Sequence, residues 1–395
     1  MFITILKKVR QQILLLLVVT LVLLAAYVSA GRQFMPAISG YVPFFEQQIF
    51  EITGVPVSVE SLTGSFQGFN PVIQVNALSF QLGNDSSSKL DPDRSALVFE
   101  SANVIVDIPR SIWQRRWVLE EFSIDALEVD VEQTESGSWQ LSGLNIAGGE
   151  SVDLAAIYRS FLRVSRLDLR NVTINLLIND GGRVSLANGF ATIQNLDQDH
   201  HLHIRANLEG NSQQLLFSLE VQGSNLEDVD GQLHLRMPPA DYSQLFSGQK
   251  FGSVDIEQLV GGGDFWIRLR DGEVEAIVAD ASLDNVTLIT QDAIDSLEPA
   301  VLNNISGLAA VRRGIDPEQW EILLSDVSVS WRDLAWDDFS AYVYFAPEQK
   351  IEARFDKLDL SLLAQFITAS GLGSDSIRQQ LDAFSPRGML DNFSL

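Results

Sequence analysis

The sequence contains no cysteine, which excludes disulfide bonds, thiolate catalysis and cysteine-ligated zinc. Positive charge is also scarce: 27 Lys and Arg residues stand against 52 Asp and Glu residues, so the formal net charge is 27 − 52 = −25. Proteins that bind nucleic acids need a basic surface, and an acidic chain of this kind does not supply one. We therefore exclude nucleic acid as a partner.

Catalytic motifs are missing as well: the chain has no G-x-S-x-G, no P-loop, no H-E-x-x-H and no EF-hand loop. In the segment DHHLHI, which contains His200, the side chains of His201 and His203 would share one face of a strand. That pair could bind a metal ion or belong to a polar strand face, and the lack of a second ligand cluster favours the polar face. We predict no enzyme activity, no metal and no cofactor.

Three polar or glycine-rich features are interpreted as turns. The acidic pairs at 120–121 and 337–338 fit solvated turns, with a glycosidase-type carboxylate pair as the alternative. The run Gly261–Gly263 lacks the downstream helix of a phosphate-binding loop. The sequence also contains a basic cluster that consists of Arg110, Arg115 and Arg116. This cluster fits either a solvated turn or a contact for a phospholipid head group or a partner.

One long apolar run is present. Residues 13–30 carry no charge, and their 18 residues make about 27 Å of helix, close to the thickness of a bilayer's hydrocarbon core. Basic residues occur before the run at 7–10 and after it at Arg32, and none follows until Lys89. The positive-inside rule then predicts a cytoplasmic N-terminus and an exported body. The predicted transmembrane helix, 13–31, includes Ile13, Leu17, Leu21, Leu24 and Tyr27.

The anchor has an alternative, and a second helix follows it. Val28-Ser29-Ala30 before Gly31 fits a signal-peptidase site, but the apolar run is longer than the usual hydrophobic region of a signal peptide, which favours a retained anchor. In residues 32–54 a helix is predicted from Pro43, because Phe45, Ile49 and Ile52 share one face. This helix either packs on a core or lies on the membrane surface.

From Val55 onward the apolar residues mostly alternate, which predicts β-strands joined by turns such as Asp271-Gly272. Helical spacing occurs only at 154–162, 360–370 and 376–384. We therefore predict a mainly β protein in which a transmembrane helix precedes a curved, elongated antiparallel sheet with a few short helices.

Several predicted strands change phase by one residue at an Ala, Asn or Asp, which we call a pivot residue. The stretch VIQVNALSF (72–80) is the first of these: Ile73 and Val75 alternate up to Ala77, and Leu78 then continues the pattern on the other parity. A bulge or a kink keeps apolar side chains on one side across such a slip, so repeated slips predict a bent sheet that forms a trough. The alternative is a corner that joins the two sheets of a sandwich. The predicted pivots are Ala77, Ala126, Asn171, Asn285 and Asp333, most of them 45 to 49 residues apart.

Two long segments and the C-terminal FSPRGMLDNFSL carry a resemblance to a known family. The segments are ITGVPVSVESLTGSFQGFNPVIQVNALSF (52–80) and VIVDIPRSIWQRRWVLEEFSIDALEVDVEQTESGSWQL (104–141). Their order resembles AsmA-like proteins of the YhdP type, in which a helical turn and a basic-aromatic step precede a pivot strand pair and a Gly-x-Trp. Ser111, Trp113, Arg116, Trp117, Leu119, Gly137 and Trp139 occupy those places here.

The resemblance implies an anchor in the bacterial inner membrane and a long periplasmic β-groove that conducts phospholipid toward the outer membrane. Longer relatives imply that this chain corresponds to an N-terminal portion. We expect a cytoplasmic tail at 1–12, a juxtamembrane helix at 32–54 and a periplasmic groove at 55–395, with phospholipid and other envelope proteins as partners. The alternatives are a membrane-anchored β-scaffold that binds proteins, or an exported hydrolase. The predicted groove lining is Ile73, Val75, Val106, Val129, Val131, Leu167, Leu169 and Ile174.

Overall fold

The structure, a computed structural model, describes sixteen segments of the chain, and all that follows concerns these. They are 2–53, 57–81, 96–115, 119–133, 139–141, 165–178, 182–196, 198–223, 228–246, 250–251, 254–290, 300–314, 319–331, 334–346, 350–370 and 375–395. The chain divides into two compact units. Unit 1 comprises Met1–Leu127 and Arg163–Arg170, and unit 2 comprises Glu128–Leu162 and Asn171–Leu395. The predicted helical segment at 154–162 lies outside the described residues.

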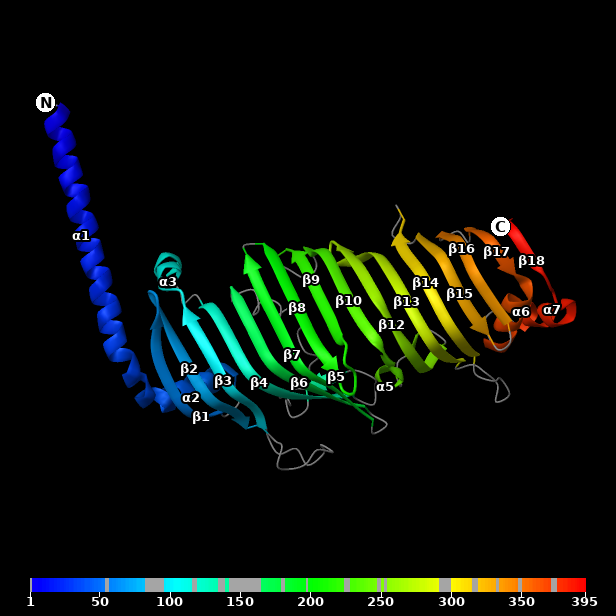
Figure 1. Ribbon diagram of the computed structural model, residues 1–395, viewed down its shortest axis with the longest axis horizontal. Coiled ribbons are helices and arrows are strands. Elements are labelled where there is room, and N and C mark those ends of the chain that lie inside the picture. Colours follow the sequence, from blue (N-terminus) through cyan, green and yellow to red (C-terminus); the bar gives the residue numbers. More distant parts are fainter. Residues whose placement is uncertain are drawn as a thin grey trace. The chain divides into compact units, whose positions relative to one another are not determined.

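Unit 1 joins an apolar helix to a small antiparallel sheet (Figure 1). Its helices are α1 (Phe2–Phe34), the 3-10 helix η1 (Met35–Tyr41), α2 (Val42–Thr53) and α3 (Ile108–Gln114). Its strands are β1 (Val57–Gln67), β2 (Asn70–Gln81), β3 (Ala96–Val106) and the first part of β4 (Leu119–Gln133). The strands pair in chain order. The predicted helix from Pro43 is α2, which starts one residue earlier.

Unit 2 is a longer ladder of antiparallel strands that mostly pair with their neighbours in the chain. The strands are β5 (Trp139–Leu141), β6 (Arg166–Leu177), β7 (Arg183–Leu196), β8 (Asp199–Leu208), β9 (Gln214–Gln222), β10 (Asp230–Asp241), β11 (Lys250–Phe251), β12 (Val254–Arg270), β13 (Glu273–Thr290), β14 (Ala300–Arg313), β15 (Trp320–Trp331), β16 (Leu334–Ala346), β17 (Lys350–Asp359) and β18 (Met389–Ser394). Three helices, α5 (Ser243–Phe246), α6 (Leu360–Ser370) and α7 (Asp375–Phe384), accompany them. β4 and β6 each contribute residues to both units.

The predicted fold class is confirmed: the described chain is mainly β, with one N-terminal apolar helix, a curved sheet that does not close and few short helices. Among the described strands, no second sheet closes over the first to make a sandwich. The predicted helices at 360–370 and 376–384 correspond to α6 and α7.

The first predicted pivots bend their strands as expected. Ala77 and Ala126 have left-handed backbones, with φ of 48° and 56°. The pairing of β1 with β2 keeps the same register on both sides of Ala77, so no extra residue is inserted and the slip is a kink. Ile73, Val75 and Leu78 all pack in one apolar cluster across it. The kink thus keeps both halves of β2 apolar on the same face.

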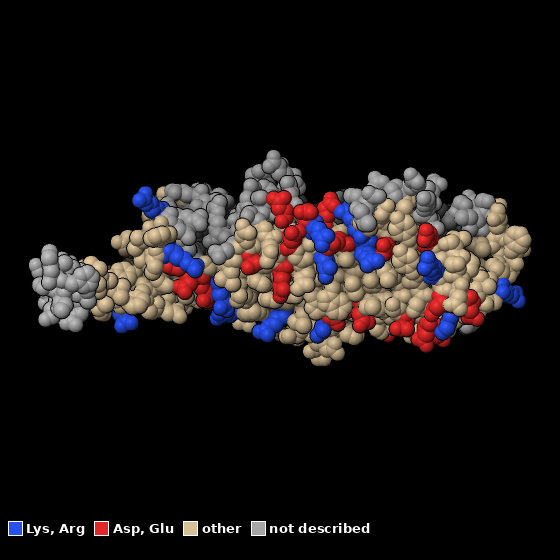
Figure 2. All heavy atoms as spheres, turned by 90° about the horizontal axis from the view of Figure 1, so that it is seen from above, with Lys and Arg blue, Asp and Glu red and all other residues tan. Residues whose placement is uncertain are grey.

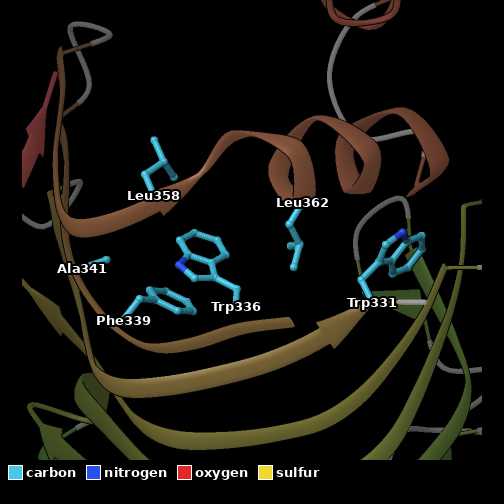
Figure 3. Packing of buried hydrophobic residues seen from close by; sticks show 6 residues of the cluster. All are labelled: Trp331, Trp336, Phe339, Ala341, Leu358 and Leu362. Carbon is cyan, nitrogen blue, oxygen red and sulfur yellow. The ribbon is translucent and has the colours of Figure 1, made fainter. Parts of the chain in front are cut away.

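Unit 2 has left-handed backbones of the same kind at polar residues of its strands. Left-handed backbones, with φ between 49° and 52°, occur at Asn171, Asn188, Asn304, Asp326, Asp338 and Asn392. Asn and Asp tolerate this conformation better than most residues do. Leu324 and Val327, which flank Asp326 three residues apart, pack against the same cluster. The slips therefore bend successive strands while the apolar side chains stay on the inner face, as Figure 3 shows for the strands around Trp336 and Phe339.

One predicted pivot was wrong, and another is a bulge. Asp333 lies outside the described residues, and Trp331 pairs with Leu334, so that slip is a hairpin between β15 and β16. Asn285 is not left-handed, but Val260 pairs with Asn285 and Gly261 with Leu283, so Asp284 is an extra residue and the predicted slip is a bulge of β13. Alternation on both sides of a hairpin mimics a phase change, which explains the error at Asp333.

Three predicted turns were wrong as well. Gly261–Gly263 lie inside β12, where a Cβ at Gly261 would come within 2.5 Å of Leu283 Cα. Glycine is needed there because the neighbouring backbone leaves no room for a side chain, and because Gly261 has a φ of 143°. The acidic pairs at 120–121 and 337–338 lie within β4 and β16, and Asp338 is a pivot.

The pivots divide each bent strand of unit 2 into two arms, and short helices cover one of these arms. The covered arm is the part of β13–β17 that packs with α6, and it contains the cluster residues Leu288, Leu302, Val329, Trp331, Trp336 and Leu358. Trp331, which is labelled in Figure 3, is only 1% exposed and meets Phe366 of α6 edge-on at 5.5 Å. Immediately before α5, Tyr242 is also buried, at 2% exposed, and donates its hydroxyl hydrogen to Pro238 O at 2.5 Å. Burial raises the pKa of Tyr242 to about 12.

Candidate functional site

The opposite arm, beyond the pivots, carries two continuous rows of apolar side chains on the inner face of unit 2. Each residue of a row is the direct cross-strand partner of the next. We call these the apolar rows and this arm the open arm. One row is Ile204, Phe217, Leu235, Phe265, Ala279, Ala309, Leu324, Ala341, Phe355 and Phe393; the other is Leu202, Leu219, Leu233, Ile267, Ile277, Val311, Ile322, Val343 and Ala353.

The rows run across the strands, so strand spacing sets their length. The longer row crosses ten strands, and nine steps of about 4.8 Å give a lane of roughly 43 Å. No row member carries a charge or a hydrogen-bonding side chain. An apolar lane of this length can accommodate a long hydrocarbon chain but offers no acid, base or nucleophile.

Most row residues are more exposed to solvent than the residues of a protein core. Apart from Ala341 and Ala353, the row residues are half-buried, whereas Trp331 and Leu358 of the covered arm are 1% and 4% exposed. At the β15–β18 end of the longer row, Leu324, Ala341, Phe355 and Phe393 pack in the same cluster as α6, whereas the rest of the rows lies outside that cluster. A contiguous apolar face of this size is unusual on a soluble monomer and indicates a ligand or an interaction site.

The outer face of the same strands is mostly polar. Between the rows, His203, Ser218 and His234 point the other way on β8, β9 and β10, followed by Trp266 on β12. His234 stacks on Trp266 at 5.1 Å and bonds Asp264 at 2.7 Å. Burial raises the pKa of Asp264, but hydrogen bonds from His234 and Arg236 outweigh it and leave the pKa below its ordinary value.

Paired charges lie at the ends of the open-arm strands. Arg270 pairs with Glu275 at 2.7 Å, and Arg312 pairs with Glu321 at 2.5 Å. Arg313 pairs with Glu273, and its guanidinium lies 5.7 Å from the centre of the Trp320 ring. On the face seen in Figure 2, acidic and basic side chains are mixed and form no field of one sign. The charged strand ends therefore form a hydrated rim that runs alongside the apolar rows.

The eight predicted lining residues lie outside the apolar rows. Ile73 and Val75 belong to the cluster of unit 1 that η1 and α2 cover through Ile38, Val42 and Phe45. Four others lie on β4 and β6, where Val129, Val131, Leu169 and Ile174 are half-buried. Val106 and Leu167 are buried, each 6% exposed. That these eight residues line a lipid groove stays a prediction, and segments such as QLLFSLEV and QLHLRM already showed the alternation that forms the rows.

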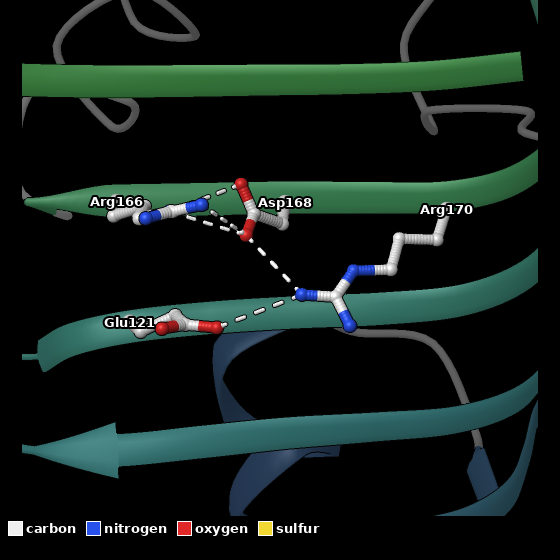
Figure 4. A network of polar contacts seen from close by, with 4 residues as sticks. All are labelled: Glu121, Arg166, Asp168 and Arg170. Carbon is white, nitrogen blue, oxygen red and sulfur yellow. Dashed lines mark hydrogen bonds and ion pairs between the residues drawn. The ribbon is translucent and has the colours of Figure 1, made fainter.

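Buried polar networks hold β4 and β6 together in both units. In unit 1, Asp168 is fully buried, bonds Arg166 at 3.0 Å and Arg170 at 3.4 Å, and Arg170 lies 4.0 Å from Glu121 (Figure 4). The bond to Asp168 is the main cause of a raised pKa for Arg166. These charges are paired, as burial requires, so their role is structural.

In unit 2, Asn175 is fully buried and uses both ends of its amide. Its nitrogen donates to Glu128 and Asp130, at 3.1 and 2.7 Å. Its oxygen accepts from Arg183 and Ser185, at 2.8 and 2.9 Å. A satisfied amide of this kind fixes the positions of its neighbouring strands, so this network also has a structural role.

A carboxylate, Glu220, lies next to the predicted histidine pair His201 and His203. Glu220 of β9 is the cross-strand partner of His201, and the possible ligand atoms of His201, His203 and Glu220 lie within 4.8 Å of one another. His200 points elsewhere and bonds Asn195 at 2.9 Å. Gln232 donates to Glu220 at 3.3 Å, so this carboxylate already has a protein partner. The absence of a bound metal stays a prediction.

The predicted anchor lies in α1. Its predicted residues are exposed, from 36% at Tyr27 to 59% at Ile13. Among the described residues there is one helix long and apolar enough to cross a membrane, and none of its apolar window is buried. A core helix of a soluble protein would be covered, so this exposure fits a helix that lies in lipid.

Comparison with known proteins supports the family resemblance. The model of the family described as "YhdP protein" matches residues 1–395. The intermembrane phospholipid transporter YhdP of Escherichia coli (strain K12) is 24% identical over 282 residues, which cover 70% of this chain and 18% of that relative's length. No solved structure matches the chain. The family match over the whole chain shows that this protein belongs to the YhdP family.

Proposed function

We propose that this protein carries phospholipid between membranes, with the acyl chains lying on the apolar rows of unit 2. The observation that carries the proposal is the continuity of the rows across β8–β18, where every cross-strand pair is apolar and most of the residues are half-buried. The related Escherichia coli protein is named an intermembrane phospholipid transporter, which supports the same class of ligand.

The proposed mechanism is passive. Each CH2 group that leaves water for the rows contributes about 0.8 kcal/mol, so a whole acyl chain is held firmly. Because successive strands present similar aliphatic and aromatic groups, a chain that slides by one strand exchanges one apolar contact for another at little cost. The head group would stay at the charged rim, where it keeps its hydration.

The proposed setting is the bacterial inner membrane, with α1 as a single-pass anchor and the N-terminus in the cytoplasm. The strands would then lie in the periplasm and conduct lipid toward the outer membrane. The basic residues at 7–10 and their absence between Arg32 and Lys89 support this orientation. The lack of acid-base groups in the rows supports a carrier and not a hydrolase.

Photocrosslinking in cells tests the proposal with adjacent residues on opposite faces of β12. A photoreactive amino acid at Phe265 belongs to a row, and the same amino acid at Trp266, which is 42% exposed, faces outward. We expect phospholipid adducts from position 265 and not from position 266. The membrane-anchored scaffold is the alternative: protein adducts at 265 without lipid would support it and overturn the proposal.

A further inference from the structure

Unit 1 presents large apolar side chains to solvent on α3. Trp113 is 89% exposed and Ile112 is 74% exposed, although the helix is capped at both ends. Asp107 accepts a hydrogen bond from Arg110 N at 2.8 Å, and Arg115 ends the helix with a left-handed backbone. A fixed helix that exposes tryptophan in this way needs an apolar partner to cover it.

The pairing of the strands places α3 at one end of the sheet. Gln67 at the end of β1 pairs with Asn70 at the start of β2, and Val106 at the end of β3 pairs with Leu119 at the start of β4. The turn at 68–69 and the α3 connection therefore leave the sheet at the same end. Phe69, in that turn, is 52% exposed. Two apolar projections thus share this end of unit 1.

The contacts along β1 show that α1 leaves from the same end. Tyr27 of α1 packs on Phe66 at 5.6 Å, while Glu46 of α2 accepts a hydrogen bond from Val59 N at 2.8 Å. As the chain advances from Tyr27 to Glu46, it therefore runs along β1 away from the Phe66 end. The residues before Tyr27 must then extend past that end, beside the turn and α3, which agrees with Figure 1.

The charge around α3 fits an anionic membrane surface. Arg110, with a side chain 62% exposed, and Arg115, also exposed, flank the apolar pair. Arg110 also pairs with Asp107 at 3.4 Å, but the guanidinium stays largely exposed. The chain as a whole has a charge of −25, so two exposed arginines beside a tryptophan are a local exception. Arg and Trp side chains favour the head-group region of a bilayer, where the ring is buried and the cation stays wet.

We propose that α3 and the Phe69 turn insert into the surface of the bilayer that α1 crosses, with Trp113 and Ile112 below the head groups and Arg110 and Arg115 among them. The proposal rests on the membrane anchor of the proposed function and adds a second contact to it. Together with α1, this contact holds the ends of β1–β4 against the membrane and fixes the tilt of unit 1 on it.

The absence of cysteine allows a direct test, because a single introduced cysteine is the only labelling site. The full chain carrying Trp113→Cys or Ile112→Cys is labelled with a nitroxide and reconstituted in vesicles of phosphatidylethanolamine and phosphatidylglycerol. The matched control is Glu60→Cys, an exposed site in the middle of β1. The measurement compares collisions of each label with membrane-soluble oxygen and with a water-soluble nickel complex.

We expect the labels at 113 and 112 to collide more with oxygen than with nickel, and the label at 60 to do the opposite. Arg110→Gln together with Arg115→Gln should move label 112 toward water in anionic vesicles and not in phosphatidylcholine. If labels 113 and 112 are as open to nickel as label 60, while circular dichroism shows folded protein, the inference is wrong.

The outcome is separable from that of the proposed function. Lipid adducts at position 265 with a water-exposed label at 113 would leave lipid carriage standing and overturn only the membrane contact of α3. A membrane-inserted label at 113 without lipid adducts at 265 would do the reverse.

Discussion

The two arms of the bent strands in unit 2 are built from similar apolar residues but end in different environments. In the covered arm, Trp331, Trp336 and Leu358 are 1% to 6% exposed and pack in the same cluster as α6. In the open arm, the row residues outside that cluster, apart from Ala353, are half-buried on a curved face. Hydrophobicity alone therefore does not distinguish a core from an open apolar face. The short helices make the difference, because they fill one arm and leave the other open.

The largest expected effect comes from truncating the covered arm. Trp331→Ala should lower the free energy of unfolding of unit 2 by about 3–5 kcal/mol, because it empties a fully buried site against α6. Phe217→Ala in the open arm should cost only about 1–2 kcal/mol, since that ring is half-buried. Urea unfolding followed by circular dichroism measures both. Equal losses would contradict the division into two arms.

A charge in the open arm should interrupt lipid carriage without unfolding the protein. Ala279→Asp places a carboxylate in the middle of a row. Photoreactive residues are placed at Ile204 or at Phe355, on either side of the carboxylate. Their phospholipid adducts should fall to the level obtained at outer-face positions. The matched control, Val278→Asp, faces outward on the same strand and should leave both adducts unchanged. We expect each substitution to cost roughly 1–2 kcal/mol of stability at most. Unchanged adducts at both positions would argue against movement along the row.

The pivots offer a test of the bend that separates the arms. Asp338, with φ of 49°, should tolerate glycine almost without loss, whereas Asp338→Val should cost about 1–3 kcal/mol because a β-branched residue is strained there. Thermal unfolding compares the two variants. If valine proved as stable as glycine, the left-handed kink would not be what bends β16.

The smallest effect concerns the outer face and acid stability. Because the folded-state pKa of Asp264 lies below its ordinary value of 3.8, its carboxylate stabilises the fold above that value. This contribution is lost as the pH falls through 3.8 toward the lower folded-state pKa. Asp264→Asn should therefore flatten the dependence of stability on pH between about pH 5 and 2, as measured by urea titrations.

Local sequence patterns were sufficient for most elements of the fold. The uncharged run before Gly31 predicted the helix that exposes its apolar side chains, and alternation predicted the strands. The phase slips at Ala77, Ala126 and Asn171 predicted bends, since a residue that breaks the parity of a strand must redirect it. The same pattern failed at Asp333, because a tight hairpin also joins two alternating strands.

The location of the apolar lane was decided by tertiary structure. Ile73 and Val75 have the same alternation as Leu233 and Leu235, yet the first pair is covered by η1 and α2 and the second lies on the open rows. A residue's own sequence neighbourhood does not record which distant helix packs over it. The sequence by itself determined the anchor, the strand faces and the bends, since these depend on local periodicity and backbone preference. Only the packing of α2, α5 and α6 decided which apolar faces became core and which remained open.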